Sequence, residues 1–188
     1  GNVADYKRVV RAIDGVGDLQ VYPTWDGGGT VKLSIIGADW MPASEQLVET
    51  VQNIVDPPPD QGLGYGTAPI GATVTVTAPE TVTVDVEASL AVGPGYTVGQ
   101  LQGGVERAVE DYLLSIRKSW DKPDASGLTH YSCWVYAARL AAAMLSVGGV
   151  VNVTGLTING IEGDLALVED GQLQQHHQHP DARKEQGL

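Results

Sequence analysis

The chain contains the same helix-to-strand pattern twice, once near each end. The segments YKRVVRAIDGVGDLQV and LAAAMLSVGGVVNV both place apolar residues at helical spacing before a Gly-Val step. Each copy predicts a helix that ends at Gly15 or Gly149 and is followed by a strand. We expect Val16 and Val150 to occupy equivalent positions and to point into hydrophobic cores. The doubled unit favours an elongated body with two comparable lobes.

The segments between the two copies predict further strands and helices. Strand periodicity is strongest in ATVTVTAPETVTVDVEASLAV, where Thr and Val alternate. Pro57–Pro59 stop the helix predicted over residues 43–56, and QGLGYGT is interpreted as a flexible loop. Thr97 and Gln100 form a capping box for the next helix, and a last helix is expected from about Ser132.

The resulting order, αββαβ and then βααββ, predicts an α+β fold. We expect two similar small lobes of mostly antiparallel sheet, with helices packed on one side and with ferredoxin-like (split βαβ) character. The first α/β lobe is predicted to span residues 1–78 and the second, with a repeated helix-strand unit, residues 79–173. Residues 174–188 have no apolar period and predict a polar extended tail. The chain begins without Met, directly at a helix start, and is interpreted as part of something longer.

Composition argues against several classes of function. The net charge is −12, and the 11 Lys and Arg residues are scattered, which disfavours nucleic acid and anionic membranes as partners. The single cysteine, Cys133, excludes an internal disulfide and fits a reducing compartment. The longest apolar run contains Arg139 and is too short to span a bilayer.

The motifs that could carry chemistry are incomplete. The run GPGYTVG at residues 93–99 lies where a dinucleotide loop would, but its glycine spacing differs and Pro94 removes an amide. We interpret it as a turn into a capped helix. Cys133 has His130 nearby but neither an orienting group nor an oxyanion site, so a buried, inert thiol is the preferred interpretation.

The candidate metal ligands and the clustered carboxylates do not form a complete metal site or an acid–base pair either. The tail histidines could bind a transition metal but have no second shell: His176, His177 and His179. The carboxylate clusters are interpreted as solvated surface charge: Glu106, Glu110, Asp111, Glu162 and Asp164. We therefore predict no catalytic residue, no metal site, no cofactor and no enzymatic activity.

Three tryptophans are candidate interface residues. Trp25, Trp40 and Trp120 fall in predicted loops or at the edges of elements. Tryptophan in such places often anchors an interface, although it equally often closes the end of a core.

These segments together resemble the baseplate J-like proteins of phages, most of all those of PBSX-type prophages and related contractile tails. The likeness runs through GNVADYKRVVRAIDGVGDLQVYPTWDGGGTVKLSIIG, PASEQLVETVQNIVDP, APIGATVTVTAPETVTVDVEASLAVGPGYT and YAARLAAAMLSVGGVVNVTGLTINGIEGDLALVEDGQL, or about residues 1–173. Gly148 stands where the family usually has Pro, and residues 120–131 look idiosyncratic. The family's N-terminal portion is absent, which fits a C-terminal fragment.

The resemblance implies a structural virion component, a wedge protein of the contractile-tail baseplate, with no catalytic residues or cofactors. Its partners would be other baseplate and tail proteins, with no nucleic acid, membrane or small-molecule substrate. We expect it in the virion tail baseplate, and in the host cytoplasm during assembly, and we expect the isolated fragment to be monomeric. The alternative is a ferredoxin-like small-ligand-binding or regulatory domain, which would need convergent polar residues in a cleft. An enzyme ranks third.

Overall fold

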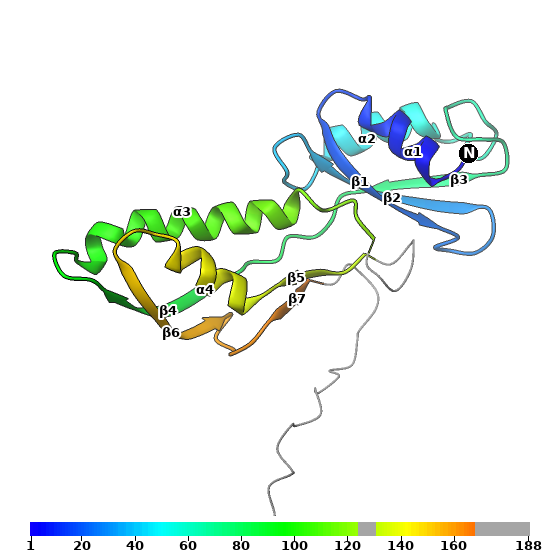
Figure 1. Ribbon diagram of the computed structural model, residues 1–188. Helices are drawn as coiled ribbons and strands as arrows, with labels where there is room; N and C mark the ends of the chain where they lie inside the picture. The colour runs from blue at the N-terminus through cyan, green and yellow to red at the C-terminus, as the bar shows by residue number, and fades with distance from the viewer. Residues whose placement is uncertain (124–130, 168–188) are drawn as a thin grey trace, which may run out of the picture.

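The computed structural model describes residues 1–123 and 131–167 (Figure 1). The first elements are α1 (Val3–Arg11), β1 (Val16–Pro23), β2 (Thr30–Gly37), α2 (Glu45–Val55) and β3 (Thr73–Thr77). They are followed by β4 (Val86–Val92), α3 (Val98–Arg117), β5 (Cys133–Val135), α4 (Ala137–Leu145), β6 (Val150–Ile158) and β7 (Leu165–Leu167). The α+β class is confirmed. We call residues 1–78 the first lobe and the described residues after 78 the second lobe; this boundary and the ferredoxin-like character stay predictions.

The first lobe is a three-stranded sheet in the order β1-β2-β3, with α1 and α2 on one face (Figure 1). β1 pairs with β2 in antiparallel orientation, and β2 pairs with β3 in parallel orientation. Parallel neighbours cannot be joined by a tight hairpin, so the chain needs a crossover connection between them. The segment that contains α2 supplies it.

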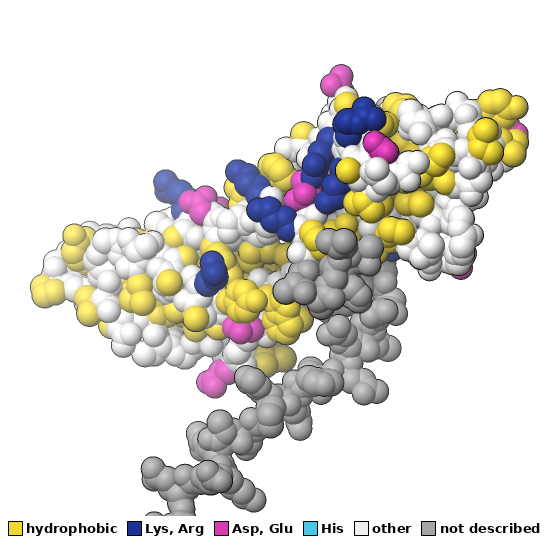
Figure 2. Space-filling model, turned by 45° about the vertical axis from the view of Figure 1, so that its right-hand side comes forward, with side chains coloured by type: hydrophobic (Ala, Val, Ile, Leu, Met, Phe, Trp, Pro, Cys, Tyr) yellow, Lys and Arg dark blue, Asp and Glu magenta, His cyan; other side chains and the backbone are white. Residues whose placement is uncertain are grey.

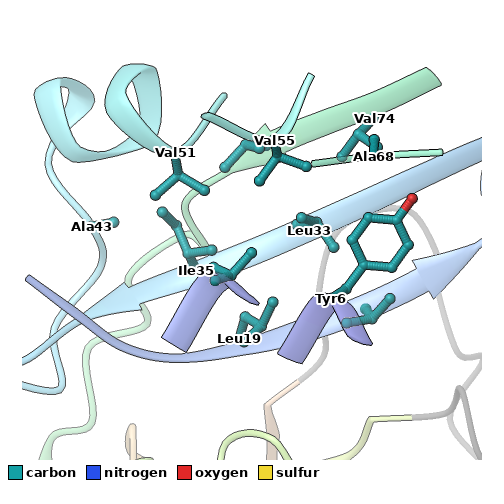
Figure 3. Packing of buried hydrophobic residues seen from close by; sticks show 12 residues of the cluster. Tyr6, Leu19, Leu33, Ile35, Ala43, Val51, Val55, Ala68 and Val74 are labelled. Atoms are coloured by element: carbon teal, nitrogen blue, oxygen red, sulfur yellow. The ribbon is translucent and has the colours of Figure 1, made fainter. Parts of the chain in front are cut away.

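The core of the first lobe lies between this sheet and the two helices (Figure 3). Leu19 and Leu33 from the sheet and Val51 and Val55 from α2 are fully buried. Burying an aliphatic side chain of this size contributes about 1.5–3 kcal/mol. This cluster therefore holds both helices on the sheet.

The second lobe contains two separate two-stranded sheets, β4-β6 and β5-β7. Val135, Leu140 and Ile158 form its buried core, against which side chains of α3 pack. The expectation of a helix from about Ser132 is wrong, because Cys133–Val135 is β5 and α4 begins at Ala137. This stretch is extended because it pairs with β7, which lies about thirty residues further along the chain.

The repeated unit has the same form in both lobes. α1 and α4 each contain 9 residues, and Gly15 and Gly149 follow them with φ angles of 91° and 102°. The helices themselves end earlier than predicted, at Arg11 and Leu145 with Ala12 and Ser146 as caps, and the glycine three residues after each cap redirects the chain, because glycine adopts such angles without steric cost. The next residue begins a strand in each copy, so the predicted helix–glycine–strand unit is confirmed. Val16 packs against the first core, whereas Val150 is half-buried.

Charged residues of α1 join the first lobe to the segment that follows α3. The Asp121 carboxylate accepts a hydrogen bond from Arg11 at 2.7 Å, and the Asp121 carbonyl accepts one from Lys7 at 2.7 Å. Arg11 also pairs with Asp18 at 2.8 Å. Partly exposed ion pairs contribute about 1 kcal/mol or less each, so this network fixes the orientation of the segment more than it stabilises the fold.

The predicted tail at residues 174–188 lies outside the described residues. Deleting it should change the melting temperature by no more than about 2 °C, because the segment offers little apolar surface to bury. Differential scanning calorimetry of the full and shortened chains measures this. A decrease above about 5 °C would show that the tail is integral to the fold.

Candidate assembly interface

A cavity of about 360 Å³ lies between the two lobes and brings two of the predicted interface tryptophans together. Trp40, in the turn after β2, and Trp120, just after α3, both line it. The Trp120 indole N–H is buried and has no hydrogen-bond partner among the residues described. Both side chains are half-buried, so replacing either would alter the packing of the junction as well as any contact with a partner.

Trp25 lies apart from this cavity, on the hairpin between β1 and β2. Its side chain is 48% exposed. The Lys32 ammonium lies 5.8 Å from the centre of the Trp25 ring and 5.1 Å from that of Tyr22, which is cation–π geometry. Trp25 is therefore a preformed, accessible aromatic surface, and its role as an interface residue stays a prediction.

The loop at residues 57–72, which we call the apolar loop, is a candidate contact surface that sequence reasoning missed. Leu63, Tyr65 and Ile70 are 57%, 74% and 84% exposed. Figure 2 shows hydrophobic side chains at the end of the first lobe that lies farthest from the second lobe. Asp60 is the only charged residue in the loop. That combination, apolar residues between glycines with almost no charge, is the signal the sequence offered.

The apolar loop is held in place by Asp56, which is fully buried at the end of α2. Its carboxylate accepts hydrogen bonds from the Gly62 N–H at 2.9 Å and the Val74 N–H at 2.8 Å. A Cβ on Gly66 would lie 2.2 Å from the Val55 carbonyl oxygen, so the loop passes against the end of α2 where only glycine fits. The loop interpreted as flexible is thus tied to its lobe by specific hydrogen bonds.

The run at residues 93–99 forms a turn that leads into α3, as interpreted from the sequence. The Gln100 side chain accepts from the Thr97 N–H at 2.9 Å, and the Thr97 hydroxyl accepts from the Gln100 N–H at 3.4 Å, so the capping box is confirmed. The predicted surface carboxylates are all exposed: Glu106, Glu110, Asp111, Glu162 and Asp164. Asp164 accepts a hydrogen bond from the Ala137 N–H at 2.8 Å at the start of α4.

Of the remaining candidate residues for catalysis or metal binding, the structure describes only Cys133. Cys133 is half-buried, whereas His130, His176, His177 and His179 lie outside the described residues. Residues 1–123 and 131–167 contain no group of three or more His, Cys, Asp or Glu that could hold a metal ion. In the same ranges, no helix has both the length and the apolar character needed to cross a membrane.

Cys133 should react slowly with alkylating reagents. Burial raises the pKa of its thiol, and a hydrogen bond with the Trp134 backbone offsets only part of this effect. Since the thiolate is the reactive form, a raised pKa leaves less of it at pH 8. We expect iodoacetamide to modify the folded chain more slowly than it modifies free glutathione and the urea-unfolded chain, followed by mass spectrometry. Faster labelling of the folded chain would contradict the inert thiol.

The sequence comparisons point to one family. Residues 1–78 match the family model of the Baseplate J-like central domain. The chain is 39% identical over 115 residues to the uncharacterized protein YqbT of Bacillus subtilis (strain 168), covering 61% of this chain and 32% of YqbT. It is 34% identical over 112 residues to the phage-like element PBSX protein XkdT of the same strain, covering 60% of this chain and 32% of XkdT. The chain thus spans about a third of the length of these relatives. Residues 1–78 are thus similar to the Baseplate J-like central domain, and the resemblance of the chain to the baseplate J-like proteins of phages is confirmed.

Proposed function

We propose that the chain is a structural component of the baseplate of a phage or prophage contractile tail. The match of residues 1–78 to the Baseplate J-like central domain carries this proposal, and the similarity to a PBSX protein supports it. In finer terms, the chain is the C-terminal part of a wedge protein that contacts other baseplate and tail proteins. It is incorporated in the host cytoplasm and then resides in the tail baseplate.

The surface of the first lobe suits such a role. A preordered loop presents Leu63, Tyr65 and Ile70 to solvent, so little conformational entropy is lost when a partner covers them. Large apolar and aromatic side chains of this kind supply most of the energy of protein interfaces. The apolar loop and Trp25 are therefore the proposed contact surfaces, and the chain without its partners is monomeric.

The experiment that tests the function is deletion of the gene from the phage or prophage that encodes it. We expect induced cells to yield no complete contractile tails in electron micrographs, and a plasmid-borne copy to restore them. Normal tails from the deletion strain would refute the structural role.

Replacing the exposed Trp25 with alanine in the restoring copy should reduce the yield of tails at least about tenfold, because an interface anchor is worth about 2 kcal/mol or more. The melting temperature of the purified chain should fall by less than about 4 °C, since an exposed side chain adds little to folding. Trp134→Ala is the matched control, because Trp134 is 40% exposed but lies on the second lobe. Equal losses of tails for both variants would contradict a specific role for Trp25.

A further inference from the structure

The two edges of the first sheet are occupied by side chains of the chain itself. On β3, the Val74 N–H donates to Asp56 at 2.8 Å and the Val76 N–H donates to Gln52 at 2.9 Å. On β1, the Val21 N–H donates to the Tyr131 hydroxyl at 3.1 Å. An edge whose outward groups already have partners does not accept another strand. The first sheet is therefore closed to extension.

The outer edge of β6, in the second lobe, is interrupted. The register with β4 shifts between Glu87 and Ser89 and again between Ala91 and Val92, and in both places the extra residue belongs to β6. The outward Val153 N–H donates to the side chain of Asn152 at 2.9 Å. Bulges and local side-chain bonds of this kind prevent regular pairing along an edge.

β4 differs from these three edges. Asp85 and Gly93, just outside its ends, both bond toward β6: the Asp85 carbonyl accepts from the Asn159 N–H at 2.8 Å, and the Gly93 N–H donates to Gly149 at 2.9 Å. Because the backbone N–H and C=O groups of an extended strand alternate in direction, those of the odd-numbered residues point toward β6. The backbone N–H and C=O groups of the even-numbered residues then point away from β6, toward the open edge: Val86, Ala88, Leu90 and Val92.

The outward row on β4 itself has no bulge, and it has no bonded partner among the described residues. β6 is the only strand neighbour of β4 within residues 1–123 and 131–167, and no side chain in those ranges bonds to the outward groups. The side chains on its exposed face are small, at Ser89 and Ala91, with one charge at Glu87. A regular edge with few charges and no proline is the kind that accepts an added strand.

We propose that an extended segment of another protein, neutral or basic in charge, adds to the second lobe as a strand alongside β4. The spacing of the outward N–H and C=O groups matches an extended backbone, and the net charge of −12 disfavours a second copy of this chain. The identification of that protein as a tail component rests on the proposed function.

The test uses the chain labelled with ¹⁵N and the synthetic peptide KTVTVTK, blocked at both ends. We expect the peptide to slow amide hydrogen exchange at Ala88 and Leu90 by about tenfold or more near saturation, because their N–H groups gain partners. Ser89, whose N–H already faces β6, serves as the internal reference. A control peptide with N-methyl groups on two consecutive central residues blocks both of its own edges and should produce no slowing.

Two variants sharpen the result. Ala88→Pro removes one outward donor and no N–H that faces β6, so it should abolish the effect of the peptide, whereas Ala88→Val should keep it. If Ala88→Pro does not fold, the comparison of KTVTVTK with the N-methylated peptide on the unmodified chain still decides whether a strand pairs with β4.

Three outcomes would overturn the proposal: no slowing at millimolar peptide, equal slowing by both peptides, or outward amides that are already protected in the free chain. If the outward amides of the free chain are protected and this protection depends on the concentration of the chain, a second copy pairs with β4. If the protection does not depend on that concentration, another segment of the same chain pairs with it. Failure here, with tails still missing from the deletion strain, would remove this inference and leave the proposed function intact.

Discussion

Replacing Asp56 with alanine is expected to lower the free energy of unfolding by about 3 kcal/mol. The buried carboxylate accepts hydrogen bonds from the Gly62 and Val74 N–H groups, and alanine would leave both donors without a partner. Hydrogen bonds to a charged group contribute about 1.5–3 kcal/mol each. Urea unfolding followed by circular dichroism measures the change.

Two further variants separate the hydrogen bonds from the charge. Asp60→Ala removes the same charge from the exposed part of the apolar loop and should cost less than about 0.5 kcal/mol. Asp56→Asn keeps one carbonyl oxygen but turns an NH2 group toward the second donor, so it should lose most of the stability that alanine loses. Equal stability of Asp56→Ala and Asp60→Ala would show that the buried carboxylate does not hold the loop.

The same substitution should be visible at Tyr6. Burial, and after it the negative charge of Asp56, raises the pKa of the Tyr6 phenol. Removing that charge makes the phenolate easier to form, so the pKa of Tyr6 should fall in Asp56→Ala. A titration followed by NMR of the tyrosine ring reports it.

Leu140→Ala is expected to destabilise the second lobe by about 3 kcal/mol, the typical cost of emptying a fully buried leucine site. Leu140 is completely buried in α4 and packs with Val135 and Ile158. Leu145→Ala is the matched control on the same helix, because Leu145 is 43% exposed and should cost less than about 1 kcal/mol. Similar losses for the two variants would contradict the position of this core.

Leu140→Ala also tests the proposed division at residue 78. The cores of the two lobes share no residue among those described, so each has its own source of stability. We expect hydrogen exchange to accelerate in α4 and β6 while amides of β1 and β2 keep their protection. Equal acceleration across both lobes would show that they unfold as one unit.

The parts of the fold that depend on neighbouring residues were predictable from the sequence. Helix starts at Asn2 and Thr97 follow from side chains that cap the backbone three residues on, and the turns from helix into strand follow from Gly15 and Gly149. Strands β2 and β3 follow from their many β-branched residues. These signals are local in the chain, so they can be recognised without knowing what packs against them.

The tertiary structure decided what local pattern cannot encode. β5 is only three residues long, and it is a strand because β7 pairs with it from a distant part of the sequence. The apolar loop is ordered because the Asp56 carboxylate reaches across to it, and Trp40 and Trp120 share one cavity because the lobes meet there. The sequence by itself determined the helices and strands other than β5, the α+β class and the family resemblance. Which edges are closed, which apolar side chains stay exposed and where an added strand could pair depend on contacts between residues far apart in the chain, and only folding brings those residues together.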